Sequence, residues 1–429
     1  METETIQNEK ISSYEAEKGE VSKVVLLFSG GLDTSCMVKY IQDEYKAKVV
    51  TVTIDLGQPN CDLEYMKQKA YALGAEDAFV VDLKEEFANE YISKAIKANA
   101  LYQDSYPLST AIARYLQSKK AVEVADEVEA DAIAHGCTGK GNDQVRFDSS
   151  IQSLSSDIKI LAPVRECSMG RDMELKYAEK HGIPVEVSFE KPYSTDENIW
   201  GKSSECGILE DPSEEPPKDV FEFVTIPEEA PDDPEYIKIG FEDGTPISLN
   251  GTKMDLQDLV EELNYLGGKH GVGIIDITED RVVGLKSREV YECPAAVILI
   301  GSHDDLQKYC STKNENSFKE IVEQKWEDMV YSGLWFDPLM DHLNSFLNSI
   351  NKGVTGSVDV KLYKGSYKVV GRSSPNALYS KELATYEEGE IFNQKASPGF
   401  IELWNLQTKL VNELDKKSSG ECDDETMGN

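Results

Sequence analysis

A short apolar run that ends at two glycines constrains the fold of this chain more than any other feature. Residues 24–28 are all Val, Leu or Phe, and Ser29, Gly30 and Gly31 follow them directly. A continuous apolar run of this length is typical of a strand that is buried on both faces of a parallel sheet. Residues 36–45 then place Met, Tyr and Ile on one helical face. The sequence therefore predicts a strand, a tight turn and a helix in direct succession, as in an α/β sheet.

Strands and helices are predicted to alternate through the next hundred residues. The further elements predicted in this half are strands at 48–54, 78–81 and 132–134 and helices at 63–73, 84–100 and 108–129. Alternation at this spacing implies right-handed crossovers and a parallel sheet. We therefore expect a doubly wound α/β nucleotide-binding domain at 21–185, with its ligand at the carboxyl ends of the strands.

The second half of the chain has a different pattern. Residues 210–235 contain eleven acidic residues, one lysine and six prolines, so we expect an exposed segment with little regular structure. The elements predicted after it are hairpins at 236–249 and at 274–285, the latter turning at Glu279 and Asp280, helices at 256–266, 294–311, 317–332 and 337–350, and strands at 356–363 and 366–371. We therefore expect a second, α+β domain at 186–385.

The two ends of the chain are polar, apart from one amphipathic stretch. We expect residues 1–20 and 418–429 to be disordered and residues 386–417 to form a C-terminal arm. The apolar residues of this arm include Phe400, Ile401, Trp404, Leu410, Val411 and Leu414. Such a helix either folds back on its own domain or docks on another subunit, and the pattern does not choose between the two.

Charge and composition exclude several classes of protein. The chain has 44 basic and 79 acidic residues and a net charge of −35, which argues against binding of nucleic acid by phosphate neutralisation. No apolar run approaches the roughly 20 residues of a membrane span, and the first twenty residues lack the apolar stretch of a signal peptide. The eight cysteines are scattered, without a Cys-x-x-Cys pair. We therefore expect a cytoplasmic protein with reduced thiols.

The segment from Ser29 to Ser35, Ser-Gly-Gly-Leu-Asp-Thr-Ser, is the strongest functional signal. Its glycines allow a tight turn close to an anion, and its hydroxyls and the start of the helix supply hydrogen-bond donors. It therefore predicts a phosphate-binding loop. The spacing differs from that of a kinase-type P-loop and from that of a dinucleotide-binding loop. Taken alone, Ser-Gly-Gly also fits a capped turn of small residues.

A second glycine-rich loop lies at 135–147. It contains three glycines together with Lys140, Asn142, Asp143 and Arg146. This composition does not fit a core segment, and it leaves backbone amides free to meet a ligand. The two basic residues supply positive charge, while Asn142 and Asp143 suit an amide or an ammonium group. The segment predicts a binding loop, with a purely structural loop as the alternative.

Together the two loops closely resemble the argininosuccinate synthase family, a member of the N-type ATP pyrophosphatase group. The likeness extends from Lys23 to about Tyr379 and includes the segments from Ala100 to Arg114, Lys191 to Asn198, Gly268 to Gly273 and Lys286 to Arg288. The resemblance implies ligation of citrulline to aspartate, with ATP cleaved to AMP and pyrophosphate through a citrulline-adenylate. It also implies Mg²⁺ on the ATP phosphates and a homotetramer.

The resemblance further assigns substrate contacts to matching positions. The implied ATP contacts are Phe28, Ser29, Gly30, Gly31, Leu32, Asp33, Thr34, Ser35, Ile54 and Gly136. The implied aspartate contacts are Thr138, Asn142 and Asp143. The implied citrulline contacts are Tyr106, Thr110, Asn142, Arg146, Ser194, Ser203, Glu279 and Tyr291. In these roles Arg146 takes a carboxylate or ureido oxygen, Glu279 holds the citrulline ammonium, and Asp143 holds the aspartate ammonium and helps to remove its proton.

Several of these positions have a simpler explanation without the family. Ser194 and Asp196 would cap a helix, and Glu279 would be a solvated turn residue. The family's hydroxyl contact to citrulline can fall on different positions of the segment Ser109-Thr110-Ala111, and Ala111 cannot make it. We name Thr110 for this contact, with Ser109 as the alternative. Because the net charge of −35 repels anionic substrates and screening acts over about 8 Å, local cations are expected to dominate in the site. The candidates are Lys140, Arg146, Lys286 and Arg288.

Two other functions remain open at this point. One is a different ATP pyrophosphatase, which would adenylate another carbonyl or ureido-type oxygen. A glutamine-dependent relative would need an amidotransferase cysteine near the start of the chain, and a transfer-RNA thiolase would need paired cysteines and a basic face; none of these is present. The other is a nucleotide-sensing module without catalysis. Turnover with citrulline and aspartate separates both from the leading prediction.

Overall fold

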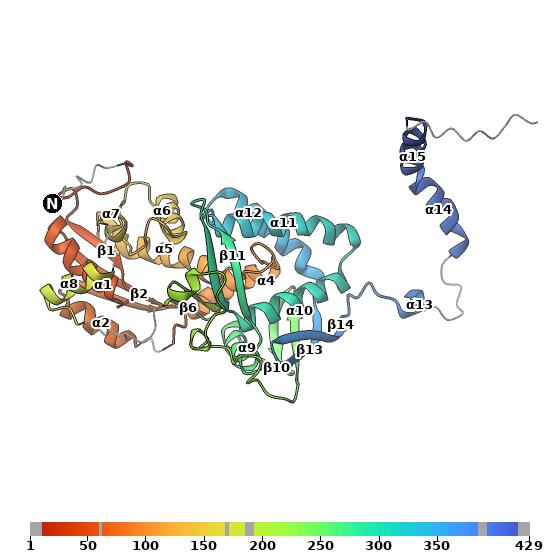
Figure 1. Ribbon diagram of the computed structural model, residues 1–429, viewed down its shortest axis with the longest axis horizontal. Helices are drawn as coiled ribbons and strands as arrows, with labels where there is room; N and C mark the ends of the chain where they lie inside the picture. Colours follow the sequence, from red (N-terminus) through yellow and green to blue (C-terminus); the bar gives the residue numbers. More distant parts are fainter. Residues whose placement is uncertain (1–10, 60–61, 168–170, 185–192, 385–392, 419–429) are drawn as a thin grey trace, which may run out of the picture. The chain divides into compact units, whose positions relative to one another are not determined.

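The computed structural model describes residues 11–59, 62–167, 171–184, 193–384 and 393–418 of the 429 (Figure 1). Contacts divide the chain into two compact units, 1–377 and 378–429. The predicted boundary near residue 185 lies inside the first unit and stays a prediction. Within the described ranges, no helix combines the length and the apolar character that a bilayer crossing needs.

The first half of the chain contains the predicted parallel sheet, which has five strands, one more than the four predicted from the sequence. Its strand order is β3-β2-β1-β4-β5, with bounds of Lys23–Leu27 for β1, Lys48–Asp55 for β2, Asp77–Asp82 for β3, Ala132–Ala134 for β4 and Lys159–Leu161 for β5. In the register, Val25 of β1 pairs with Val50 on one side and with Ile133 on the other. The central position of β1 puts the turn after it at the middle of the sheet edge.

Helices cover both faces of this sheet. The helices of this half are α1 (Leu32–Tyr40), α2 (Leu63–Ala72), α3 (Lys84–Phe87), α4 (Ser93–Lys97), α5 (Ser109–Glu127), α6 (Asp143–Leu154), α7 (Pro163–Cys167) and α8 (Arg171–His181). Of these, α4 packs mainly against elements of the second half rather than on this sheet. Val24 and Leu26 pack in one core with Met37 of α1, whereas Val25 packs in another core with Ile112 of α5. Successive residues of a strand point to opposite faces, so an all-apolar strand is what a doubly wound sheet requires.

The second half contains two antiparallel sheets. One has the order β11-β12-β7-β6 and the other β10-β9-β8-β13-β14. The strands are β6 (Ser194–Asn198), β7 (Gly201–Glu205), β8 (Glu235–Glu242), β9 (Thr245–Leu249), β10 (Thr252–Lys253), β11 (Ile274–Asp280), β12 (Lys286–Glu292), β13 (Gly356–Tyr363) and β14 (Ser366–Ser373). The helices are α9 (Leu256–Lys269), α10 (Pro294–Cys310), α11 (Lys313–Tyr331) and α12 (Pro338–Ile350).

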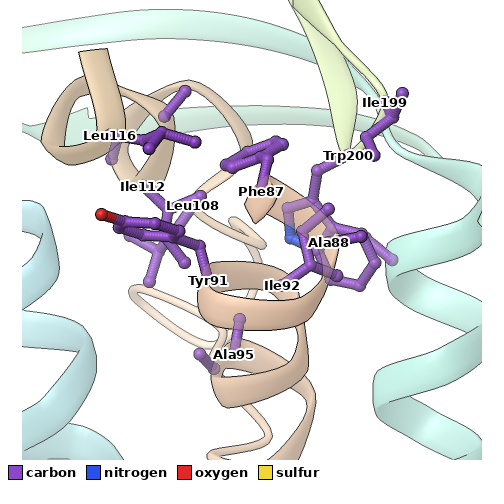
Figure 2. Packing of buried hydrophobic residues seen from close by; sticks show 14 of the residues in the cluster. Phe87, Ala88, Tyr91, Ile92, Ala95, Leu108, Ile112, Leu116, Ile199 and Trp200 are labelled. Carbon is purple, nitrogen blue, oxygen red and sulfur yellow. The ribbon is translucent and has the colours of Figure 1, made fainter. Parts of the chain in front are cut away.

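The two halves share a hydrophobic core. The turn between β6 and β7 carries Ile199 and Trp200, both buried, into the cluster that contains Phe87 and Ala88 (Figure 2). The Trp200 indole N–H donates to the Pro107 carbonyl oxygen at 2.9 Å. Because a close-packed core resists displacement, β6 and β7, the strands on either side of this turn, are held at a fixed place beside the parallel sheet.

Four local predictions were wrong. Residues 194–198 form strand β6 rather than the start of a helix, because they pair antiparallel with β7. Glu279 lies in β11 and is buried rather than solvated, since the second hairpin turns at 281–285. Helix α9 continues through Gly267 to Lys269. The segment 210–235 is irregular but not fully exposed: Val220 and Val224 are buried.

The ends of the described chain also differ from expectation in part. Residues 11–20, predicted to be disordered, contact β5: the Ala16 amide donates to the Ile160 carbonyl oxygen at 3.1 Å. Residues 1–10 and 419–429 lie outside the described residues. The second unit contains α13 (Lys381–Ala384), α14 (Ser397–Trp404) and α15 (Leu406–Ser418), and none of their described side chains is buried within the single chain.

Candidate active site

A cleft of about 720 Å³ lies at the carboxyl ends of the parallel strands. It is bordered by the loop after β1, the ends of β2 and β4, helices α2, α5 and α6, and the start of β6. The predicted ATP contacts that line it are Phe28, Ser29, Gly30, Gly31, Leu32, Asp33, Thr34, Ile54 and Gly136. Ser35 does not line the cleft: it is buried, and its hydroxyl donates to the Gly30 carbonyl oxygen at 3.4 Å.

The loop after β1 has the geometry of an anion site. Gly30 has φ +74°, and a Cβ there would lie 2.3 Å from Met66 Sδ, so only glycine fits. The Ser29 and Thr34 hydroxyl oxygens are 3.1 Å apart. No side chain caps the N-terminus of α1. The amides of its first turn are therefore available to an anion, in line with the helix dipole.

A pair of arginines holds Asp143 at the far side of the cleft. The Asp143 carboxylate accepts from Arg146 Nη1 and from Arg114 Nη2, both at 2.8 Å. Burial by itself raises the pKa of Asp143, but the charges of Arg114 and Arg146 outweigh it and lower that pKa to about 2. Arg114 also pairs with Asp196 of β6. The carboxylate is therefore ionised at neutral pH and joins α5 to α6.

Next to this pair lies a cluster of aromatic side chains, defined here as the tyrosine cluster: Tyr102, Tyr106, Tyr291 and Tyr331. The rings of Tyr106 and Tyr291 stack with centroids 4.1 Å apart. The Tyr106 and Thr110 hydroxyl oxygens are 2.7 Å apart. The predicted citrulline contacts from α5 and β12 thus meet at one place.

Glu279 lies buried within the tyrosine cluster. It accepts from the Tyr331 hydroxyl at 2.7 Å and also from the Tyr291 hydroxyl. Burial raises the pKa of this carboxyl, and the two tyrosine hydrogen bonds counteract part of that rise. Glu279 is thus an acidic group in an apolar setting, which suits recognition of a cation.

Asn142 and Arg146 connect the second glycine-rich loop to the tyrosine cluster. Asn142 Nδ2 donates to the Tyr331 hydroxyl at 2.8 Å, and Asn142 Oδ1 accepts from the Val282 amide at 2.9 Å. Arg146 Nε donates to the Tyr331 carbonyl oxygen at 3.0 Å, with the guanidinium 4.9 Å from the ring centroid. Within the described residues, the buried Arg146 Nη2 has no hydrogen-bond partner. That nitrogen can therefore donate a hydrogen bond to an oxygen atom of a ligand.

Three predicted contacts lie around this centre. Ser194 lines the cleft at the start of β6. Ser203 of β7 is half-buried and pairs in register with Asp196 on one side and with Tyr291 on the other. Thr138 is exposed on the glycine-rich loop and does not line the cleft. The structure therefore gathers the predicted aspartate and citrulline residues around Asp143, with Thr138 at the margin.

The predicted local cations behave differently from one another. Arg146 belongs to the site, but Lys140 is exposed and does not line the cleft. Lys286 pairs with Asp280, and Arg288 pairs with Asp276 at 2.6 Å. Each of these two basic groups is neutralised by an aspartate of the β11–β12 hairpin. Of the basic candidates, the structure thus places only Arg146 among the predicted substrate residues.

Two buried histidines, His135 and His270, each pair with a carboxylate. His135 Nε2 lies 2.7 Å from Asp148 Oδ1, and His270 Nε2 lies 2.9 Å from Glu235 Oε2. Among the described residues, there is no group of three or more His, Cys, Asp or Glu side chains that could hold a metal ion. These histidines hold local structure together.

Sequence reasoning missed three residues of the site. Tyr331 ends helix α11, and Arg281 opens the hairpin turn. Lys69 lies on the face of α2 that meets the first loop. Lys69 lines the cleft, and Arg281 donates to the Lys140 carbonyl oxygen at 3.2 Å. No local motif marks them, because each acts across contacts between elements that are distant in sequence.

Comparison with known proteins identifies the family. The family description "Arginosuccinate synthase N-terminal HUP domain" matches residues 23–184, and "Arginosuccinate synthase C-terminal domain" matches residues 193–411. The argininosuccinate synthase of Pyrococcus furiosus is 55% identical over 389 residues, which are 91% of this chain and 94% of that protein. The enzymes of Rubrobacter xylanophilus and Bacillus licheniformis are 52% and 50% identical, over 90% and 92% of this chain and 94% and 98% of their own. Both domain descriptions, together with an identity of 50% or more over at least 90% of the chain, show that the chain belongs to the argininosuccinate synthase family of ligases.

Proposed function

We propose that the cleft and the tyrosine cluster together ligate L-citrulline to L-aspartate, with ATP cleaved to AMP and pyrophosphate. The observation that carries the proposal is the unbroken path of contacts from the cleft to the cluster. Asp143 lines the cleft and pairs with Arg146, which donates to Tyr331, whose hydroxyl donates to Glu279. A nucleotide and a second substrate bound at the two ends of this path would be in reach of each other.

ATP is proposed to lie with its phosphates on the loop from Ser29 to Thr34. The open amides at the start of α1 and the hydroxyls of Ser29 and Thr34 supply donors for phosphate oxygens. Ile54 and Gly136, at the ends of β2 and β4, border the same cleft. Gly136 leaves room for the adenosine part, because glycine carries no side chain.

Citrulline is proposed to lie in the tyrosine cluster. The Glu279 carboxyl would hold its α-ammonium, and Arg146 Nη2, which has no partner among the described residues, would take an oxygen of its carboxylate or ureido group. The ureido oxygen then attacks the α-phosphorus of ATP. The new O–P bond forms as the bond to the β-phosphate oxygen breaks, and pyrophosphate leaves with that electron pair. Positioning supplies most of this rate acceleration.

Aspartate is proposed to bind beside Asp143 and Asn142. In the second step, its amine attacks the ureido carbon of the adenylate and AMP leaves. Sequence reasoning gives Asp143 a part in removing the ammonium proton, but a carboxylate with a pKa of about 2 is a poor base. We therefore assign Asp143 the orientation of the ammonium, to which its remaining lone pairs can accept hydrogen bonds.

Mg²⁺ is proposed to enter with ATP. Asp33, Ser29 and Thr34 line the phosphate end of the cleft and carry oxygen donors, the ligand type that Mg²⁺ prefers alongside phosphate oxygens. These residues fit an ion that is held mainly by its nucleotide. When bound there, the ion would neutralise phosphate charge as pyrophosphate leaves.

The protein is proposed to be cytoplasmic and to form a homotetramer. The reason for proposing subunit contacts is the apolar surface of the C-terminal arm. Leu403 and Trp404 are 71% and 74% exposed within the single chain. Helices that leave this much apolar surface uncovered are typical of subunit contacts.

The reaction is tested by incubating the purified protein with Mg-ATP and citrulline, aspartate or both. AMP, pyrophosphate and argininosuccinate are expected only with both amino acids. Citrulline alone should support exchange of labelled pyrophosphate into ATP, which reports the adenylate. Release of ADP, or exchange that does not depend on citrulline, would overturn the proposal. Nucleotide binding without turnover would favour a sensing module.

A further inference from the structure

The lysine and arginine side chains that line the cleft, among the described residues, are Lys69 and Arg114. Arg114 is already paired with Asp143 and Asp196. The Lys69 ammonium pairs with no carboxylate in the described parts of the chain. Its bond is to a neutral acceptor, the Gly30 carbonyl oxygen, at 2.7 Å. Lys69 therefore brings to this loop a positive charge that is not paired with a carboxylate of the described residues.

Helix α2 is built to hold this lysine against the loop. Its N-terminus is capped by Asp62, whose carboxylate accepts from the Tyr65 amide at 2.9 Å. Met66 and Lys69 lie three residues apart and so share a face. Met66 occupies the space that a Cβ of Gly30 would need. The same glycine thus contacts both side chains, which fixes the ammonium at the loop.

Binding of the anionic pyrophosphate group at this loop is strengthened by a positive charge such as that of Lys69. The other groups of the loop are neutral amides and hydroxyls, together with the acidic Asp33. Hydrogen bonds from a charged donor to phosphate are about twice as strong as those from neutral donors. An ammonium group has three N–H donors, and the bond to Gly30 uses one of them.

We propose that Lys69 binds the β- and γ-phosphates of ATP and stabilises the pyrophosphate that forms from them. This inference rests on the proposed function and adds a catalytic residue to it. As the bond between the α-phosphorus and the β-phosphate oxygen breaks, negative charge grows on the leaving pyrophosphate. A fixed ammonium at that end of the cleft stabilises this charge more than it stabilises bound ATP.

The test compares Lys69→Met, Lys69→Arg and the control Lys67→Met. Lys67 lies on the same helix but does not line the cleft. Pyrophosphate and AMP binding are measured separately by calorimetry, together with the steady-state constants for ATP and citrulline. Lys69→Met should weaken pyrophosphate binding, raise the KM for ATP by about tenfold or more and also lower kcat, while AMP binding changes less than about twofold. Lys69→Arg should recover part of the loss, and Lys67→Met should resemble the wild type.

Two results would overturn the inference. If Lys69→Met leaves pyrophosphate binding unchanged, the ammonium does not contact these phosphates. If it weakens AMP and pyrophosphate equally, Lys69 only shapes the loop through Gly30. Failure of the proposed function itself is a separate outcome: the wild-type protein would then make no AMP from ATP, citrulline and aspartate.

Discussion

At the scale of single residues, the site depends on buried polar groups whose partners come from distant elements. Glu279, Arg146 and Tyr331 are each less than 4% exposed. A buried polar group that loses its partner keeps the full cost of its desolvation. Small changes at these residues are therefore expected to affect substrate binding strongly.

Tyr331→Phe is expected to impair the use of citrulline and aspartate together. The change removes the hydroxyl that donates to Glu279 and accepts from Asn142. We predict a rise of about tenfold in KM for both amino acids, with the KM for ATP changed less than about twofold. Tyr115→Phe is the control, because that buried hydroxyl donates to the Val330 carbonyl oxygen instead. Equal kinetic effects from both variants would contradict the assigned role.

Asp143 is expected to make stability depend on acid pH. Its pKa is lowered from 3.8 to about 2, so its stabilising contribution is complete above pH 4 and is lost as the pH falls through about 2. This shift corresponds to about 2 kcal/mol. The difference in unfolding free energy between the wild type and Asp143→Asn should therefore shrink by about that amount between pH 5 and pH 2. Urea titrations at a series of pH values measure it, and a constant difference would rule out the shift.

At the scale of elements, the β11–β12 hairpin joins the glycine-rich loop to the second half of the chain. Arg281 pairs with Glu205 at 2.6 Å and with Glu289 at 2.8 Å, and it also donates to the Lys140 carbonyl oxygen. The neighbouring Val282 amide donates to Asn142. The hairpin thus determines where the loop residues proposed to bind aspartate lie.

Arg281→Gln is expected to loosen this contact. Removing the guanidinium leaves the largely buried Glu289 without its counter-ion, which should cost about 3 kcal/mol of stability. The KM for aspartate should rise by about tenfold, because the loop is no longer held. Lys286→Gln in the same hairpin breaks only an exposed pair with Asp280 and should change stability by less than about 1 kcal/mol. Thermal unfolding and initial rates test both variants, and an unchanged KM in Arg281→Gln would separate the hairpin from aspartate binding.

At the scale of the whole molecule, the two halves of the compact unit share one core. Ile199 lies in that core, and its amide donates to the Leu56 carbonyl oxygen at 2.8 Å, next to the end of β2. The residues of β6, β7 and β12 that are proposed to bind substrate are thereby fixed relative to the proposed phosphate loop. Such a core favours a site that is formed before the substrates bind.

The arm is expected to control assembly. Replacing Leu403 and Trp404 together by Asp should convert the proposed tetramer into smaller species, because charged groups oppose burial of this surface. Tyr236→Asp is the control: that tyrosine is 62% exposed on β8, outside the arm. Light scattering at micromolar concentration measures the molar mass of the assembly in each variant. A tetramer that survives the double change would show that the arm does not hold the subunits together.

The sequence alone determined the parallel sheet and its phosphate loop. Both follow from local patterns: an apolar run, a pair of glycines and helical spacing act within a few residues of one another. It also pointed to Asp143 and Arg146, through an unusual loop composition. Family resemblance added Tyr106, Glu279 and Tyr291, for which local patterns favour packing or solvated turns.

Only the tertiary structure revealed the contacts from which roles are proposed for Lys69, Tyr331 and Arg281. Lys69 meets Gly30 across 39 positions of the chain, and Tyr331 meets Asn142 across 189. Nothing in the residues beside them encodes those contacts, since a lysine on a helix is usually solvated and a tyrosine usually packs. Their roles arise because two independently patterned halves are brought together by a common core, and the energy of such contacts depends on that arrangement rather than on local sequence.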